Sequence, residues 1–216
     1  MSIIEKTRGL PRAALVGFIA PLIALVCIVL AVAISPSFDW VTNALSDLGH
    51  YTRTDIGPNP LVRAIIFNAG LATTGVLLII ITLGFLKQIN DWPTRIAMLP
   101  FLIAAGFLTA IGIFSENFNP IHFTVSVGLF ITFPFAMWFV GLSWLRYRHL
   151  WWFCVISLLL PFFSVYIWWG TLNGVLPWSG MAIPEILTAM TAILWIWIFL
   201  TLEVQGKLSH LVTHSE

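Results

Sequence analysis

Long apolar runs separated by short polar segments dominate the hydropathy pattern of the chain. A transmembrane helix needs roughly 20 mostly apolar residues to cross about 30 Å of hydrocarbon. Six runs meet this requirement, with expected bounds of 12–34, 61–86, 95–114, 121–143, 150–172 and 181–203. The pattern predicts an all-α, polytopic membrane protein. Residues 1–216 are expected to form a single transmembrane helical bundle whose six helices are arranged as three hairpins.

The composition supports this class. The chain is 59% hydrophobic and 9% charged, whereas soluble domains are about 45–50% apolar and about 25% charged. Too few charged residues are present to cover a water-facing surface, which excludes a soluble globular domain and intrinsic disorder. The formal net charge of +1 provides no basic field for nucleic acid, so we expect membrane lipid as the partner and no nucleic acid.

The basic residues predict the orientation, because Lys and Arg are retained in cytoplasmic loops. Eight of the ten Lys and Arg residues fall on one side of the predicted bundle, and Arg53 and Arg63 fall on the other. The eight are Lys6, Arg8, Arg12, Lys87, Arg95, Arg146, Arg148 and Lys207. We therefore expect a multi-pass protein of the cell membrane with both termini in the cytoplasm.

The first non-cytoplasmic loop, residues 35–60, contains a short amphipathic pattern. The apolar residues Val41, Ala44, Leu45 and Leu48 follow helical spacing, and Gly49 is a plausible stop. This spacing predicts a helix over about residues 39–49 that lies on the outer end of the bundle. The opposite face of that helix carries Asn43, Ser46, Asp47 and His50.

Other polar residues are predicted on the same side of the membrane. Glu116 precedes span four and Glu185 lies in the first turn of span six, where a carboxylate can simply satisfy the N–H groups of a helix amino end. His122 is two residues into span four, with Ser126 one turn later. Asn68 lies about two turns into span two and needs a hydrogen-bond partner there.

The chain contains side chains of the types that bind divalent metals, but it contains no known metal-binding sequence motif. Asp47, His50, His122 and Glu185 match the side chains that zinc and similar ions prefer, and a bound ion would activate water at neutral pH. The chain has no HExxH motif, and these residues come from separate segments. The cofactor stays open, with a divalent metal such as zinc as the candidate.

Four short sequence motifs indicate a resemblance to a known family. They are residues 42–49 (TNALSDLG), 66–71 (IFNAGL), 112–116 (GIFSE) with His122, and 183–185 (IPE). Together they resemble the six-helix prokaryotic membrane family catalogued as a domain of unknown function, number nine hundred and ninety-eight. The resemblance implies the fold class, the membrane location and a recurrent set of polar positions, and it implies no reaction. The chain departs from the family at Ser115, where the family typically has proline.

A weaker likeness connects the chain to the superfamily of membrane hydrolases that includes alkaline ceramidases. Those proteins place Ser, Asp and His residues around a zinc at one end of a helix bundle. This chain lacks their paired-histidine spacing on the last helix, and it has six predicted spans where they have seven. The likeness is an analogy.

The sequence is compatible with two functions, and it does not decide whether the protein is an enzyme. In the first, Asp47, His122 and Glu185 converge in a polar pocket at the non-cytoplasmic end that binds a lipid or a small molecule. In the alternative, a metal-assisted hydrolase acts on a lipid or lipid-linked substrate at the outer leaflet. A transporter is less favoured because the polar residues gather at one end, and the sequence does not predict the oligomeric state.

For the hydrolase, Asp47, His122, Glu185 and Glu116 are the candidate catalytic residues. In either case the candidate binding residues are Asn43, Ser46, His50, Asn68 and Ser126.

Overall fold

The computed structural model describes residues 12–211, and within them the regular structure is helical. The long helices are α2 (Arg12–Ala33), α3 (Pro60–Gln88), α5 (Leu99–Ile113), α6 (Ile121–Trp144), α7 (Trp151–Leu172) and α8 (Ala182–Val204). The short ones are α4 (Trp92–Ala97), η1 (Leu45–Gly49), η2 (Glu116–Phe118), η3 (Arg148–Leu150) and η4 (Ser209–Leu211), where η denotes a 3-10 helix.

The helix bounds confirm the six predicted spans. Six helical segments of the described chain are long and apolar enough to cross a membrane, and their ends agree with the prediction to within three residues. The third span is broken, because α4 ends at Ala97 and α5 begins at Leu99. Pro100 lies in the first turn of α5, and a proline has no N–H with which to continue the hydrogen bonding of α4. Lys6 and Arg8, which belong to the predicted cytoplasmic amino end, lie outside the described residues.

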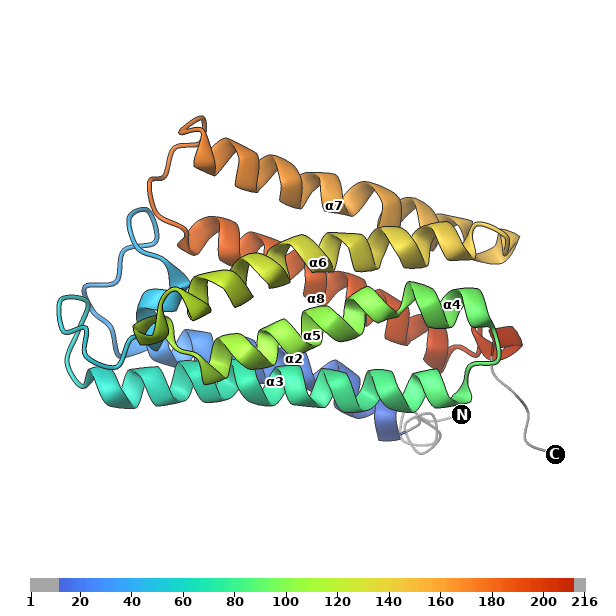
Figure 1. Cartoon of the computed structure of the whole chain (residues 1–216), viewed down its shortest axis with the longest axis horizontal. Coiled ribbons are helices and arrows are strands. Elements are labelled where there is room, and N and C mark those ends of the chain that lie inside the picture. Colours follow the sequence, from blue (N-terminus) through green and yellow to red (C-terminus); the bar gives the residue numbers. More distant parts are fainter. Residues whose placement is uncertain (1–11, 212–216) are drawn as a thin grey trace, which may run out of the picture.

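The long helices form a ring of consecutive neighbours. Helix α2 packs on α3, α3 on α5, α5 on α6, α6 on α7 and α7 on α8, and α8 returns to contact α2. Helix α3 packs on α5 as well as on α2, so the arrangement of the helices as three hairpins is not confirmed. Figure 1 shows the helices side by side, with α7 at one edge of the bundle and the loop before α3 at one end. We call this end, which contains η1 and η2, the η1 end, and the opposite one the α4 end.

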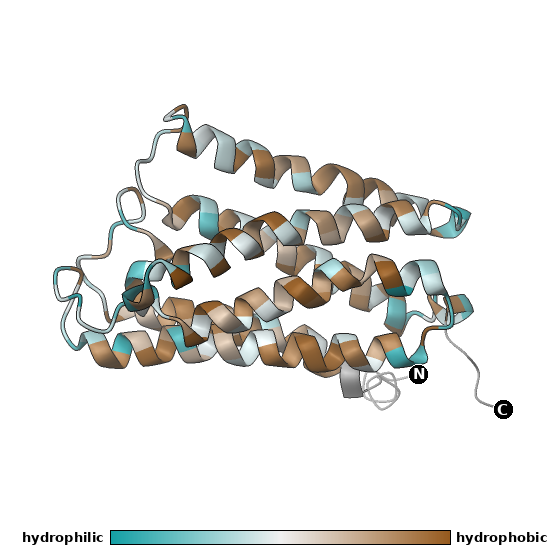
Figure 2. Ribbon diagram, viewed as in Figure 1, coloured by the Kyte–Doolittle hydropathy of each residue, from teal (hydrophilic) through white to brown (hydrophobic). Residues whose placement is uncertain are grey.

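The outer faces of the helices are apolar. Large side chains such as Leu61, Ile65 and Ile80 on α3 and Phe123 and Ile131 on α6 are exposed. Figure 2 shows that hydrophobic residues cover the helices and that hydrophilic residues gather at the two ends of the bundle. An apolar girdle between two polar ends is the surface that a lipid bilayer requires.

Aromatic side chains fill the half of the bundle toward the α4 end. The rings of Trp144 and Phe199 stack with centroids 5.5 Å apart, and Phe153 packs on Trp195 at 5.7 Å. The indole N–H of Trp195 donates a hydrogen bond of 2.8 Å to Ser157. These contacts form the aromatic core of the bundle.

The predicted amphipathic helix over residues 39–49 is only partly correct. Residues 40–42 form a turn, residues 43 and 44 are irregular, and the helical part is η1, a short 3-10 helix from Leu45 to Gly49. Asp39 helps to prevent a longer helix, because its side chain accepts a hydrogen bond from the N–H of Val41 at 2.7 Å and stabilises a turn. Leu45, Asp47 and Leu48 of η1 are buried, so the segment is inserted into the end of the bundle.

Candidate functional site

Backbone hydrogen bonds join the loop before α3 to the segment that leads into α8. The N–H groups of Ser179 and Gly180 donate to the carbonyl of Val41 at 3.0 and 2.7 Å, and the N–H of Ala182 donates to the carbonyl of Asn43 at 2.9 Å. A Cβ atom at Gly180 would lie 2.3 Å from the Asn43 oxygen. The two segments therefore meet at a distance that only glycine permits.

Glu185 continues this connection with its side chain. Its Oε2 atom accepts a hydrogen bond of 2.6 Å from the N–H of Leu45, at the first residue of η1. The carboxylate thus contacts a different segment of the chain, whereas the simplest expectation was that it would satisfy the amino end of its own helix. Glu185 fixes the position of η1 over the start of α8.

Asp47 is buried at the centre of η1 and forms an ion pair. One of its oxygens pairs with the Arg53 guanidinium, and the other accepts a hydrogen bond from the N–H of Ala44 at 2.9 Å. Arg53 also contacts the exposed carboxylate of Asp55 through Nε at 3.0 Å. The sequence predicts only on which side of the membrane Arg53 lies. Its ion pair with Asp47 was not predicted, because two residues six positions apart in an irregular loop have no periodic pattern that would pair them.

A fully buried arginine holds η1 and the following loop in place through hydrogen bonds to their backbone carbonyls. Arg63, on the first turn of α3, has no exposed surface. Its guanidinium donates to the carbonyls of Leu48, His50 and Arg53 at 3.4, 3.3 and 2.6 Å. The sequence analysis missed this role, although a charged residue beside an apolar span is itself a signal of a specific interaction.

The predicted binding residues Asn43, His50 and Asn68 all hold the loop in place. Asn43 accepts a hydrogen bond from the N–H of Asp39 at 2.8 Å, and Asn68 donates to the carbonyl of Gly49 at 2.9 Å. The amide nitrogen of Asn117 lies 3.2 Å from Nδ1 of His50. These contacts give each of the three a structural role.

Glu116, at the start of η2, lies beside Asp47. Burial, and next the negative charge of Asp47, raise the pKa of the Glu116 carboxyl to about 7, and a hydrogen bond between the two carboxyl groups contributes in the same direction. Its Oε2 atom is buried and has no hydrogen-bond partner in the described part of the chain. The Glu116 carboxyl therefore titrates near neutral pH, beside the ion pair of Asp47 with Arg53.

His122 is buried in the first turn of α6. Its Nδ1 atom lies 2.7 Å from the carbonyl oxygen of Phe114, the residue that ends α5. Because a carbonyl can only accept, Nδ1 carries the hydrogen. Within residues 12–211 no ion pair between a histidine and a carboxylate is formed.

The predicted metal site is not assembled. Among the described residues, no group of three or more His, Cys, Asp or Glu side chains is arranged to hold a metal ion. Of the four candidate ligands, Asp47 pairs with Arg53, His50 contacts Asn117 and His122 contacts Phe114. The fourth, Glu185, bonds to the backbone of η1. At least one coordinating atom of each residue is engaged in holding the loop or a helix end in place.

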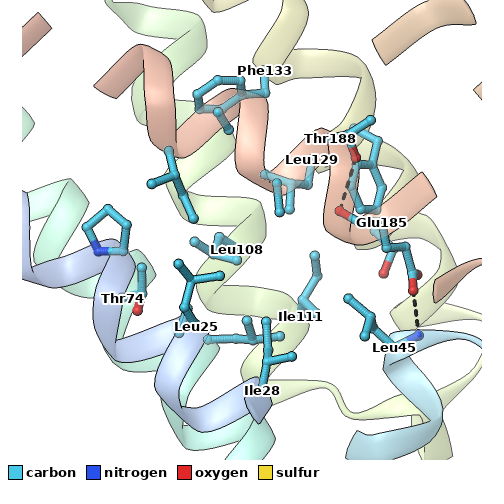
Figure 3. Close-up of a pocket in the computed structure, with 18 of the residues that line it drawn as sticks. Leu25, Ile28, Leu45, Thr74, Leu108, Ile111, Leu129, Phe133, Glu185 and Thr188 are labelled. Carbon is cyan, nitrogen blue, oxygen red and sulfur yellow. Dashed lines mark hydrogen bonds between the residues drawn. The ribbon is translucent and has the colours of Figure 1, made fainter. Parts of the chain in front are cut away.

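A cavity of about 160 Å³ lies inside the bundle behind these residues. Side chains of α2, α3, α5, α6, α7 and α8 line it, and most of them are apolar, including Ile28, Leu71, Leu129 and Phe133. Figure 3 shows Leu45 and Glu185 together at one side of the cavity and Phe133 at another. Four residues that the sequence analysis selected line this cavity, and they are Ser46, His122, Ser126 and Glu185.

The convergence of Asp47, His122 and Glu185 in one polar pocket stays a prediction. His122 and Glu185 line one cavity, whereas Asp47 is adjacent to it through Ser46 and Leu45 and does not line it. Glu116, a further candidate catalytic residue, also lies outside the cavity wall and contacts Asp47. The apolar residues of the cavity wall were not predicted, because each of six helices supplies only a few of them and no stretch of sequence marks them as a group.

This fold and this site define a six-helix, multi-pass membrane protein with an apolar cavity between its helices, bordered at one end by η1. A family model described as protein of unknown function (DUF998) matches residues 18–202, and the chain belongs to that family. No curated protein and no solved structure matches the chain.

Proposed function

We propose that the protein binds an apolar small molecule, or the end of one lipid chain, in the central cavity. The observation that supports this proposal is the combination of an apolar wall with a polar end formed by Ser46, His122, Ser126 and Glu185. Ligand sites are typically concave and mostly apolar, with a few polar groups that orient the ligand. The same residues are those that the sequence analysis selected.

The size of the cavity limits the ligand. The cavity measures about 160 Å³, and an apolar protein cavity of roughly 150 Å³ holds one benzene molecule. A whole phospholipid is too large. The part of the ligand that enters the cavity has about six carbon atoms, as in a short alkyl chain, an isoprene-like group or the end of an acyl chain.

Small side chains keep the cavity open. Ala24, Ala189 and Ala192 line the wall, so larger residues at these positions would remove the cavity without disturbing polar groups. Retaining small side chains here makes physical sense if a ligand occupies the space.

The orientation follows from the charges. Lys87, Arg95, Arg146, Arg148 and Lys207 lie near the α4 end of the bundle, and only Arg53 and Arg63 lie near the η1 end. By the preference of basic residues for the cytoplasm, the α4 end and both termini are cytoplasmic in a cell membrane. The polar end of the cavity then faces the non-cytoplasmic side.

The metal-assisted hydrolase has no comparable support. Its four metal-ligating candidates have the other partners described above, and Asp47 and Glu116 do not line the cavity. We therefore favour binding over hydrolysis.

A photocrosslinking map tests the proposal. The protein is reconstituted in phosphatidylcholine vesicles, exposed to a hexanol analogue that carries a diazirine, irradiated and analysed by peptide mass spectrometry. We expect labels on the cavity-lining faces of α6 and α8, near Leu129 and Ala192. The variant Ala192→Phe fills the cavity and should lose these labels, whereas Ala69→Phe, at an exposed position of α3, should keep them. Labels confined to lipid-facing residues would contradict the proposal.

A further inference from the structure

The polar end of the cavity presents hydrogen-bond acceptors. The Oε2 atom of Glu185 is occupied by the N–H of Leu45, and its Oε1 atom has no hydrogen-bond donor among the described residues. Because Nδ1 of His122 donates to Phe114, the neutral imidazole has a lone pair on Nε2. Both side chains line the cavity, so each brings one acceptor atom to this end.

No fixed donor balances these acceptors. The hydroxyl of Thr188, one turn after Glu185, donates to the carbonyl of Pro184 at 2.7 Å, so its hydrogen is used. Ser46 and Ser126 also line the cavity, and a hydroxyl can donate or accept as its partner requires. A ligand that places a donor here satisfies the site, whereas a ligand that places an acceptor here does not.

The distribution of charged residues around Glu185 also favours a ligand that carries a hydrogen-bond donor. Glu185 is in none of the three ion pairs formed within residues 12–211. Of the two arginines at this end, Arg53 is paired with Asp47 and Asp55, and Arg63 donates to backbone carbonyls. Burial without a positive partner favours the neutral form of a carboxyl group, and no basic side chain of the described chain pairs with Glu185. A cationic ligand would supply the partner that stabilises its charged form.

We infer that the ligand is a primary amine with a short apolar chain, whose ammonium group binds between Glu185 and His122. An ammonium carries three N–H donors and a positive charge, which matches two acceptors and an unpaired carboxylate, while the chain occupies the apolar part of the cavity. This inference rests on the proposed function, since it assigns a chemical class to the ligand of the same cavity.

Competition among molecules of equal chain length tests the inference. Hexylamine, hexanol, hexanoate and hexyltrimethylammonium compete with the diazirine hexanol analogue for labelling of α8 in phosphatidylcholine vesicles at neutral pH. A charged hydrogen bond predicts that hexylamine competes about tenfold better than hexanol. Hexanoate should compete least, and hexyltrimethylammonium, which has the charge without the donors, should fall below hexylamine.

A matched pair of variants separates the carboxylate from general surface charge. Glu185→Gln should remove the preference for hexylamine over hexanol, and its thermal unfolding in detergent shows whether the variant is folded. Asp39→Asn removes one exposed carboxylate from the same end and should retain the advantage. If Glu185→Gln does not fold, the preference of the wild-type protein for hexylamine over hexanol decides the question alone.

Two results would count against the account, and they differ. Equal competition by hexylamine and hexanol in the wild-type protein, or an amine preference that survives in a folded Glu185→Gln variant, would overturn the inference while the cavity remains a binding site. Absence of labelling inside the cavity with every compound would overturn the proposed function as well.

Discussion

The Oε2 atom of Glu185 lies 2.6 Å from the backbone nitrogen of Leu45, a residue 140 positions earlier in the chain. This hydrogen bond joins the first turn of α8 to the first residue of η1, and both residues line the central cavity. Oε2 thus holds the loop in place, and in the proposed site Oε1 would accept a hydrogen bond from the ligand. The loop and the cavity are coupled through this side chain.

Replacing Glu185 with alanine should release the loop. Hydrogen bonds to charged groups contribute about 1.5–3 kcal/mol, so we expect destabilisation of this order and faster amide hydrogen exchange over residues 41–49. Glu185→Gln keeps an oxygen that can accept from Leu45 and should show a smaller effect. Unchanged exchange in Glu185→Ala would mean that the hydrogen bond does not hold η1.

Gly180 should be intolerant of a side chain. A Cβ atom there would lie 2.3 Å from the carbonyl oxygen of Asn43 and 2.4 Å from the backbone carbon of Thr42. Backbone atoms cannot move away cheaply, so Gly180→Ala should cost about 1–3 kcal/mol, as overpacking does elsewhere. Gly106→Ala is the matched control, because its Cβ would meet nothing within 4 Å, and thermal unfolding in detergent should distinguish the two. Equal melting temperatures would show that the two segments are not in close contact.

Much of the fold could be predicted from the sequence because hydrophobic length is a local property. The six spans were found within three residues, and His122 and Glu185 were selected because polar groups in apolar helices require partners. The turns around Asp39, the ion pair of Asp47 with Arg53 and the contacts of Arg63 could not be predicted, because each depends on how an irregular loop folds against several helices. The cavity likewise arises from side chains of many segments, none of which carries a local signal.

Stability should depend on pH through Glu116. Its pKa is raised in the folded protein to about 7 from the ordinary 4.5, first by burial and then by Asp47. Between these two values the folded state keeps a proton that the unfolded state has lost, so stability falls as pH rises through this window. The charged and titratable groups that interact electrostatically with the Glu116 carboxyl are Asp47, Asp55, Glu185 and Arg53.

Glu116→Gln removes the titrating group and should flatten this part of the pH profile. Thermal unfolding of the two proteins, measured at a series of pH values from 4 to 8, checks the expectation. We expect the variant to be relatively more stable toward pH 8 and the difference to shrink at acid pH. Parallel profiles would show that Glu116 does not titrate in this range.

Cysteine labelling tests the orientation. Thr54 is exposed between η1 and α3, and Asn90 is exposed at the opposite end of the bundle. In a background without Cys27 and Cys154, a membrane-impermeant maleimide added to intact cells should label Thr54→Cys and leave Asn90→Cys unlabelled until the membrane is permeabilised. The reverse pattern would place the polar end of the cavity in the cytoplasm.

The identity of what fills the cavity is the most direct test of the central claim. The wild-type protein, Ala192→Phe and Ala69→Phe are purified in detergent, extracted with organic solvent and compared by mass spectrometry. The account predicts that one apolar compound accompanies the wild-type protein and Ala69→Phe in a fixed ratio and is lost from Ala192→Phe, whose new ring occupies the cavity. Equal amounts of every extracted compound in all three proteins would contradict the claim that the cavity is a binding site.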